Sequence, residues 1–257
     1  MTSGRAFTLA LAALTLAAAL LAGPACAQQD TTGAPARSGG SAPAERNVRK
    51  GYLFSAVSFA DSAFGVEWSR LRAEAQEHFP DLKLTKVEDL HITVVYIGGD
   101  WKPEDLDRIR AHALVAPAGR ARMTPEVVRM GRNNQVVAVE LHGAPAAWTD
   151  SVIAAKRALN DLGLKKPDAY DTTFRTHITL AEARHSPPTE ADSTALAAFQ
   201  SWIVTRVAAD PARFSATVGP RTVVGLLLAG ATRPEGAPEY VTVEDFLERH
   251  LGAAPGK

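Results

Sequence analysis

The sequence predicts a fold of mixed strands and helices in which one strand–turn–helix unit occurs twice. The tripeptide His-Ile-Thr stands at residues 91–93 and again at 177–179, each time inside a short apolar run typical of a strand. A proline and a helical pattern follow each copy, at an interval of 12 residues (91 to 103) in the first and 11 (177 to 188) in the second. These two repeats favour an internal duplication over coincidence, although strand, proline and helix also succeed one another in unrelated proteins.

Hydrophobic periodicity predicts the elements in chain order. The first part contains a strand over 52–59, a helix over 64–79 ended by Pro80, the first His-Ile-Thr strand over 90–97, and a helix opened by Pro103. In the middle, strands over 127–130 and 136–141 flank a turn at 131–134, and a helix over 145–162 ends at Gly163. The last part contains the second His-Ile-Thr strand over 174–181, a helix after Pro188, strands over 223–228 and 240–243, and a helix from the Thr242–Asp245 capping box through Leu251.

The N-terminus has the pattern of an export signal. Arg5 is the only charge before an apolar stretch over 7–22, and Ala25-Cys26-Ala27 offers an A-x-A cleavage site before Gln28. We therefore expect a signal peptide at 1–27, a disordered linker at 28–48, a folded domain at 49–252 and a tail at 253–257. The mature protein should be periplasmic or secreted, without stable membrane insertion once the signal is removed. Lipidation of Cys26 is the alternative, and Gly23 fits it poorly because a lipoprotein box carries a larger aliphatic residue there.

Cysteine content and charge exclude several kinds of function. Cys26 is the only cysteine, so cleavage after Ala27 leaves no thiol for a disulfide, a metal site or a nucleophile. Without Arg5 the chain has 27 basic and 28 acidic residues (28 minus 1, against 28). This balance argues against an extended nucleic-acid polymer as partner, because polymer binding relies on many phosphate contacts to a basic surface. We expect a monomer that binds a small anionic ligand through a local positive site.

Strand alternation gives the two His-Ile-Thr strands one polar and one apolar face. Each histidine shares its face with the threonine two residues later, while the intervening isoleucine faces the core. Arg175 precedes His177 by two residues and falls on the same face. By the same alternation Tyr96 falls on the core side, where we expect it to pack.

Two imidazoles that face one cleft can serve both ends of a phosphoryl transfer. Of His91 and His177, one would take a proton from the attacking oxygen and the other would give one to the leaving oxygen, near neutral pH and without a metal or cofactor. Thr93 and Thr179 would donate hydrogen bonds to the phosphate between them, and Arg175 would offset its charge. This set of residues predicts cleavage of a phosphodiester.

The same residues also have purely structural interpretations. The histidines could be hydrogen-bonded core residues, the threonines ordinary strand formers, and Arg175 a surface cation at a strand end. A zinc site is disfavoured, because neither His91 nor His177 has a second histidine or a glutamate at metal-ligand spacing. The duplication favours catalysis, because both copies keep histidine and threonine at the same spacing.

The segments around both histidines resemble the two signatures of the 2H phosphoesterases. Asp89–Gly98 resembles the first signature and Phe174–Ala181 the second, and the likeness extends from Gly51 onward, nearest to the bacterial 2'-5' RNA ligase and RNA 2',3'-cyclic phosphodiesterase group. The resemblance implies a bilobal, duplicated α+β fold, with two pseudo-symmetric antiparallel sheets and outer helices around a central cleft. It also implies metal-free hydrolysis of a 2',3'-cyclic phosphate to a 2'-phosphate, with His177 as base and His91 as acid.

Two positions depart from that pattern. Thr176 stands where the group usually has proline, and Glu182 stands where an arginine usually follows the second strand. Alternation places Glu182 opposite the face of His177, and Arg184 is a candidate replacement for the missing positive charge.

The function expected from the sequence is that of an exported, metal-independent phosphodiesterase. Its substrate would be a 2',3'-cyclic phosphate or a short oligonucleotide, that is, a small nucleotide or an RNA end. The reverse reaction, 2'-5' RNA ligation, would use the same residues and is the first alternative. A non-catalytic module that binds a nucleotide or phosphate is the second.

Overall fold

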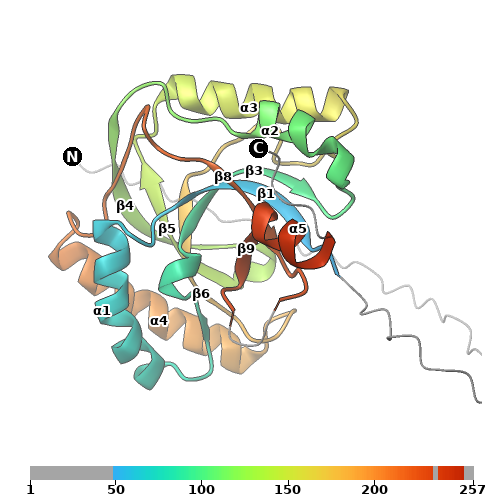
Figure 1. Cartoon of the computed structure of the whole chain (residues 1–257). Coiled ribbons are helices and arrows are strands. Elements are labelled where there is room, and N and C mark those ends of the chain that lie inside the picture. Colours follow the sequence, from blue (N-terminus) through green and yellow to red (C-terminus); the bar gives the residue numbers. More distant parts are fainter. Residues whose placement is uncertain (1–48, 234–236, 252–257) are drawn as a thin grey trace, which may run out of the picture. The chain divides into compact units, whose positions relative to one another are not determined.

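Two antiparallel sheets and five α-helices build the fold of the computed structural model, which describes residues 49–233 and 237–251 (Figure 1). The predicted signal peptide, the linker, Cys26 and the segment from Gly252 to the end lie outside the described residues.

The two sheets repeat one arrangement of strands. The first has the order β3 (His91–Gly98), β1 (Tyr52–Ser58), β8 (Gly225–Ala229) and β9 (Tyr240–Thr242). The second has the order β2 (Lys83–Leu84), β6 (His177–Glu182), β5 (Val136–His142), β4 (Ala121–Met130) and β7 (Ala216–Val218). In each sheet the His-Ile-Thr strand pairs antiparallel with the strand that precedes it in the duplicated unit, β3 with β1 and β6 with β5. The predicted pair of pseudo-symmetric sheets is confirmed.

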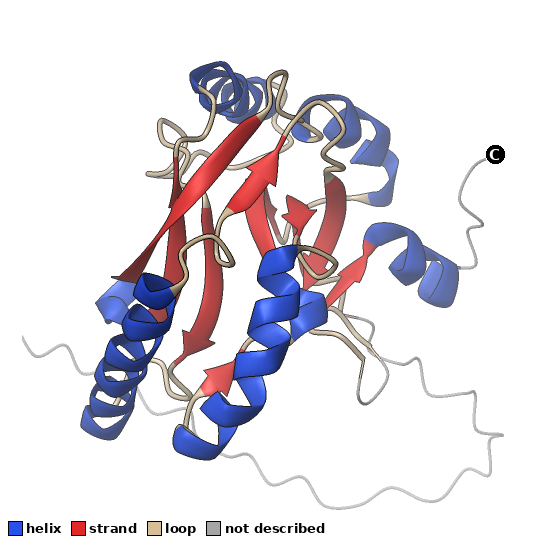
Figure 2. Cartoon of the chain, turned by 90° about the vertical axis from the view of Figure 1, so that its left-hand side faces the viewer, coloured by secondary structure: helices blue, strands red, loops and turns tan. Residues whose placement is uncertain are grey.

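The helices lie outside the strands in two pairs (Figure 2). Helices α1 (Ala63–His78) and α4 (Glu190–Ala209) pack together through the rings of Trp68 and Phe199, whose centroids are 6.3 Å apart. Helices α2 (Leu106–Ala113) and α3 (Ala146–Asp161) form the second pair, and α5 (Val243–Leu251) lies against β8 and β9. If the two-residue strand β2 is set aside, the chain order β1–α1–β3–α2 recurs as β5–α3–β6–α4. Within the described ranges, no helix combines the length and hydrophobicity needed to cross a bilayer.

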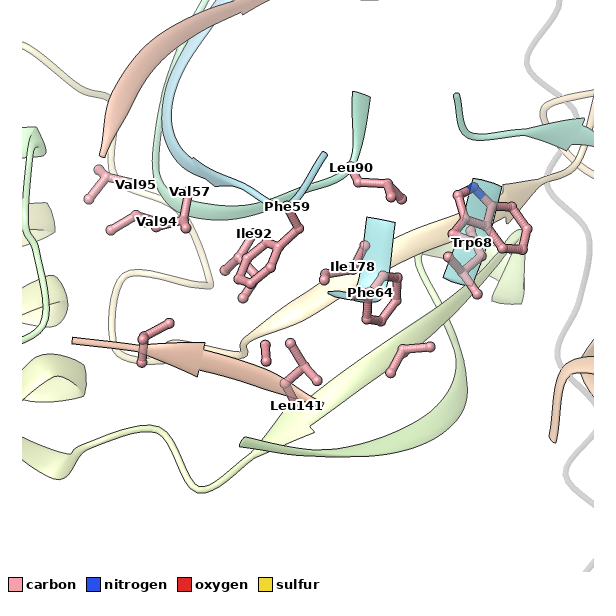
Figure 3. Close-up of a cluster of buried hydrophobic side chains, with 14 of the residues drawn as sticks. Val57, Phe59, Phe64, Trp68, Leu90, Ile92, Val94, Val95, Leu141 and Ile178 are labelled. Atoms are coloured by element: carbon pink, nitrogen blue, oxygen red, sulfur yellow. The ribbon is translucent and has the colours of Figure 1, made fainter. Parts of the chain in front are cut away.

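One hydrophobic core joins both sheets. Figure 3 shows Ile92 of β3 and Ile178 of β6 in the same cluster of buried side chains, with Phe59 and Phe64. Both isoleucines are fully buried, as the alternation predicted. Burial of one such side chain contributes roughly 1.5–3 kcal/mol, so the apolar face of each strand fixes the orientation of its polar face.

Helix α1 shows how local sequence sets an element boundary. The Ser62 hydroxyl accepts a hydrogen bond from the Gly65 N–H at 3.1 Å and so caps the first turn. A β-carbon at Gly65 would lie 2.1 Å from the Ala60 carbonyl oxygen, so the chain can enter the helix this closely only with glycine.

Most predicted elements are present, with shifted ends. Strand β6 begins at His177 rather than at 174, and β4 begins at Ala121 rather than at 127. Helix α4 begins at Glu190 because the Thr189 side chain caps it, so Pro188 precedes the helix instead of opening it. The short strands β2 and β7 were not predicted, since two or three residues carry no measurable periodicity.

Candidate active site

Each His-Ile-Thr strand carries a β-bulge at the residue after its threonine. In β3, Thr93 lies opposite Ala56 and Val95 lies opposite the next residue of β1, Ser55, so Val94 is the extra residue. The Ser55 hydroxyl accepts a hydrogen bond from the Val95 N–H at 3.1 Å and so satisfies a donor at the bulge.

Strand β6 repeats the irregularity at the equivalent position. Thr179 lies opposite Ala138 and Ala181 lies opposite Val137, so Leu180 is the extra residue. The bulge is therefore part of the duplicated unit, three residues after the histidine in both copies.

The bulges overturn two predicted side-chain orientations. An extra residue shifts the alternation by one, so Tyr96 lies on the same face as His91 and Thr93, opposite Phe54, and is 46% exposed. Its predicted packing in the core is wrong. By the same shift Glu182 lies on the face of His177 and not opposite to it.

The two histidines are held by equivalent hydrogen bonds. His91 Nδ1 lies 2.8 Å from the carbonyl oxygen of Asp89, and His177 Nδ1 lies 3.1 Å from that of Arg175, in each case two residues earlier. A carbonyl only accepts, so Nδ1 is the nitrogen that carries the proton in both neutral rings. Each Nε2 is then left unprotonated and able to accept a proton.

The ring of His91 lies in an aromatic environment. Its centroid is 5.2 Å from that of Phe54 and 4.6 Å from that of Tyr240, which meets it edge to face. Tyr240 is held there by Asp89, whose carboxylate accepts hydrogen bonds from the backbone N–H groups of Glu239 and Tyr240, both at 3.1 Å. Burial lowers the pKa of His91, the hydrogen bond to Asp89 opposes this, and the charge of His177 lowers the pKa further. Strands β3 and β6, which carry the two imidazoles, lie in contact with one another.

His177 has charged rather than aromatic neighbours. It lies opposite Glu140 of β5, and Arg175 Nε donates to Glu140 Oε1 at 2.9 Å. Burial lowers the pKa of His177 as well, while the hydrogen bond to the Arg175 carbonyl opposes the shift. The duplicated unit therefore places two similar imidazoles in dissimilar surroundings.

The structure gathers four of the five predicted site residues around one cavity of about 610 Å³. Thr93, Arg175, His177 and Thr179 line it. Both threonines are half-buried, and neither hydroxyl has a hydrogen-bond partner among the described residues. Arg175 reaches the cavity with its guanidinium already paired to Glu140, so its charge is partly neutralised.

His91, the fifth residue, lines a separate cavity of about 340 Å³ that it shares with Ser58, Asp89 and Tyr240. The structure therefore places the two histidines at different cavities, whereas the sequence predicted that both would face one cleft.

The segment between α3 and β6 forms a wall that sequence reasoning missed. Buried Lys156 donates to the carbonyl oxygens of Tyr170 (2.9 Å) and Thr173 (2.6 Å), and burial lowers its pKa. Buried Lys165 pairs with Asp168 (2.9 Å) and Asp171 (2.6 Å). These two lysines fix residues 165–175 and with them Arg175. Their partners are recognisable only once the chain has folded, since the sequence shows no periodic signal here.

The two departures in the second signature are both accommodated. The Thr176 hydroxyl donates to the Leu141 carbonyl oxygen, and the Thr176 carbonyl accepts from the Leu141 N–H at 2.7 Å, so threonine continues the contact of β6 with β5. Glu182 lies 3.6 Å from Lys83, which also binds Glu239 at 2.6 Å.

Arg184 does not replace the missing arginine. Its guanidinium donates to the Pro80 carbonyl oxygen, and its backbone N–H donates to Asp192. Both contacts hold it outside the cavity. Across residues 49–233 and 237–251, no group of three or more His, Cys, Asp or Glu side chains is placed to bind a metal ion.

Comparisons with known proteins find similar structures but no similar sequences. No protein-family model and no curated protein matches the chain. A solved structure described as a phosphoesterase aligns over 76% of this chain and 95% of its own, with 17% identity and a TM-score of 0.50. E. coli LigT in complex with 3'-AMP aligns over 75% and 94%, with 15% identity and a TM-score of 0.48. Kluyveromyces marxianus Usb1 aligns over 76% and 98%, with 11% identity and a TM-score of 0.41.

Proposed function

We propose that the chain is an exported, metal-independent phosphodiesterase that hydrolyses a 2',3'-cyclic phosphate or a short oligonucleotide. Its fold is similar to that of a solved phosphoesterase, and the segments around both histidines resemble the two 2H phosphoesterase signatures. His91 and His177 are the proposed acid and base, and Thr93, Thr179 and Arg175 the proposed phosphate-binding residues. At 17% identity the shared fold alone does not assign a substrate, so the proposal depends on the site itself.

One observation carries the proposal. Both imidazoles donate Nδ1–H to the carbonyl two residues earlier, at 2.8 and 3.1 Å, and neither Nε2 has a hydrogen-bond partner in the part of the chain that the structure describes. A core histidine needs partners for both nitrogens, whereas an acid–base pair needs one nitrogen fixed and the other open. The same arrangement occurs in both copies of the duplicated unit, which favours catalysis over a structural role.

The proposed reaction uses one proton transfer at each end. The base, His177 by the family resemblance, takes a proton from water as the water oxygen attacks phosphorus. The bond from phosphorus to the 3'-oxygen breaks, and His91 gives its proton to that oxygen, which leaves a 2'-phosphate and a free 3'-hydroxyl. Thr93 and Thr179 donate hydrogen bonds to the phosphate oxygens, whose negative charge redistributes in the transition state.

Ligation is the same displacement at phosphorus with a different nucleophile. The 5'-hydroxyl of a second strand would replace water, and the same two histidines would move the protons. Assays with and without a 5'-hydroxyl acceptor separate the two outcomes.

The test is turnover by the purified mature protein in the presence of a chelator. We expect hydrolysis of 2',3'-cyclic mononucleotides to survive exhaustive chelation and to fall about 100-fold or more in His91→Ala and in His177→Ala. His142→Ala serves as the matched control, because His142 is an exposed histidine of β5 that pairs with Glu126. Loss of activity on chelation, restored by zinc or manganese, would refute the two-histidine mechanism. Tight nucleotide binding without turnover would identify a binding module instead.

A further inference from the structure

The cavity around His177 continues beyond the reacting groups. A hollow of about 370 Å³ adjoins it, and Tyr96, Lys165 and Asp168 line both. The other walls of this hollow come from residues 97–102 after β3, from Asp105 and Ile109, and from residues 163–168 after α3. We call the two spaces together the extended groove. A 2',3'-cyclic mononucleotide would need only its first part.

Tyr96 stands at the junction of the two parts with its ring available for contact. The bulge at Val94 turns Tyr96 to this face, where it is 46% exposed. Tyr52, itself 45% exposed, stacks on it with centroids 6.5 Å apart and planes inclined by 25°. Tyr52 thus supports the ring on one side, and the rest of the ring borders the groove. Burial and the neighbouring Tyr52 and Asp168 raise the pKa of Tyr96, so the phenol stays neutral near pH 7.

The register of β3 on β1 sets the distance between Tyr96 and the chemistry. His91 lies opposite Ser58 and Tyr96 lies opposite Phe54, four residues farther along β1. At the rise of an extended strand this is about 13 Å. A nucleoside whose phosphate lies between the histidines would fill the first cavity. Tyr96 would then lie beside the neighbouring nucleoside of the oligonucleotide substrate.

The charge of the hollow limits which part of a substrate can bind in it. Its lining has three lysines and three aspartates: Lys102, Lys165, Lys166, Asp100, Asp105 and Asp168. Lys166 pairs with Asp100 at 2.6 Å and Lys165 pairs with Asp168 at 2.9 Å. Such a lining has no excess positive charge to hold a run of phosphates, but it admits a neutral base, whose flat face can stack on an aromatic ring.

We propose that the extended groove binds the nucleoside that precedes the reacting one in an oligonucleotide, with its base stacked on Tyr96. The proposal rests on the proposed function and narrows its substrate to a short oligonucleotide ending in a 2',3'-cyclic phosphate. Stacking tolerates any base, so we expect selectivity for length rather than for sequence.

Three substrates and three variants test this. The substrates are a 2',3'-cyclic mononucleotide, a dinucleotide with the same reactive end, and the same dinucleotide without the base of its first nucleoside. The wild-type protein should favour the dinucleotide over the mononucleotide by about 10-fold or more in kcat/KM, and the abasic dinucleotide should lose that advantage. Tyr96→Ala should abolish the preference and Tyr96→Phe should keep it. Tyr170→Ala is the control, because Tyr170 lines only the first cavity and its loss should affect both lengths alike.

Either of two results would overturn the proposal: no preference in the wild-type protein, or a preference that survives Tyr96→Ala or the abasic substitution. A protein that hydrolyses none of the substrates would instead refute the proposed function. In that case calorimetric binding of the 2'-phosphorylated mononucleotide and dinucleotide to the same variants tests the groove separately. Tighter binding of the dinucleotide, lost in Tyr96→Ala, is then expected, and equal affinities would refute the subsite.

Discussion

At the scale of single residues, the surroundings of the two histidines determine how the site should respond to pH. The acid must be protonated while the base is neutral, so activity requires a singly protonated pair. Ordinary imidazoles would place the maximum between about pH 6 and 8. Burial lowers the pKa of both His91 and His177, and the charge of His177 lowers the pKa of His91 further. Both titrations therefore move to lower pH.

We accordingly predict a bell-shaped pH profile of kcat/KM with its maximum below pH 6.5. A bound phosphate stabilises an imidazolium, so the maximum of kcat should lie at higher pH than that of kcat/KM. Steady-state kinetics across pH 4.5–8.5 measure both profiles. A kcat/KM maximum above pH 7 would show that the free site does not desolvate the histidines as the structure indicates.

A better leaving group separates the roles of the two histidines. A substrate whose leaving oxygen departs without protonation no longer needs the acid, so it should restore activity to His91→Ala and leave His177→Ala slow. Comparing kcat for a p-nitrophenyl ester and an alkyl ester in both variants measures this. The opposite pattern would exchange acid and base, and full activity in either variant on both esters would exclude that histidine from the mechanism.

Residue-level predictability depended on whether a signal was local. The five predicted site residues were visible as a repeated motif and one flanking arginine. Tyr240 was not, because it lies 149 positions after His91 (240 minus 91) and reaches that ring only through the backbone contacts of Asp89. Only the folded chain shows such a contact.

At the scale of elements, the bulges explain why alternation predicted part of the site and failed for the rest. Period-two reasoning placed His91, Thr93, His177 and Thr179 correctly, because all four precede the extra residues Val94 and Leu180. It failed for Tyr96 and Glu182, the two residues that follow. Ser55, a fully buried polar residue in β1, is the one local trace of the first bulge, and its meaning depends on its partner Val95.

The bulge in β6 predicts an effect of Glu182 on anionic substrates. It turns this carboxylate to the face of His177, four residues farther along β5 and so about 13 Å away. Glu182→Gln should therefore raise kcat/KM for a cyclic phosphate by about two- to threefold, since a charge at that distance in a partly solvated site contributes under 1 kcal/mol. The gain should shrink as salt is added. Asp107→Asn is the control, because this carboxylate of α2 is 95% exposed, pairs with Arg110 and lines none of the three cavities described. An unchanged rate at low salt would contradict the placement.

The wall between α3 and β6 should depend on Lys156. Lys156→Met leaves the carbonyl oxygens of Tyr170 and Thr173 without their buried donor, which should lower the free energy of unfolding by roughly 1–3 kcal/mol and raise KM by loosening Arg175. Denaturant unfolding and steady-state kinetics measure the two effects. Lys166→Met, in the segment that Lys156 anchors, is the control for stability. Lys166 is 85% exposed, so this substitution should change the free energy of unfolding by less than about 0.5 kcal/mol. Equal effects of the two substitutions would refute the proposed role of Lys156 as an anchor.

At the scale of the whole molecule, the duplication was the most informative sequence feature. Repetition of one motif predicted a duplicated strand–turn–helix unit, and the family resemblance implied two pseudo-symmetric lobes. The sheets β3-β1-β8 and β6-β5-β4 repeat one order of strands. The duplication did not predict the asymmetry between the lobes, with aromatic rings around His91 and an ion pair beside His177. That asymmetry comes from β9, which lies outside the repeated order of elements, and from the segment between α3 and β6, in which the two copies differ. It can give two identical motifs different roles.

Processing of the N-terminus gives the last prediction. Because Ala25-Cys26-Ala27 fits a signal-peptidase site, the mature protein should begin at Gln28 and be found outside the cytoplasm. N-terminal sequencing and intact mass of the exported protein measure this. Cys26→Ala discriminates between the two peptidase routes, because it keeps an A-x-A site but removes the residue that would carry a lipid. Unchanged cleavage in Cys26→Ala is expected. Blocked processing, or a lipid mass on Cys26 in the unaltered protein, would instead establish a lipoprotein anchored at Cys26.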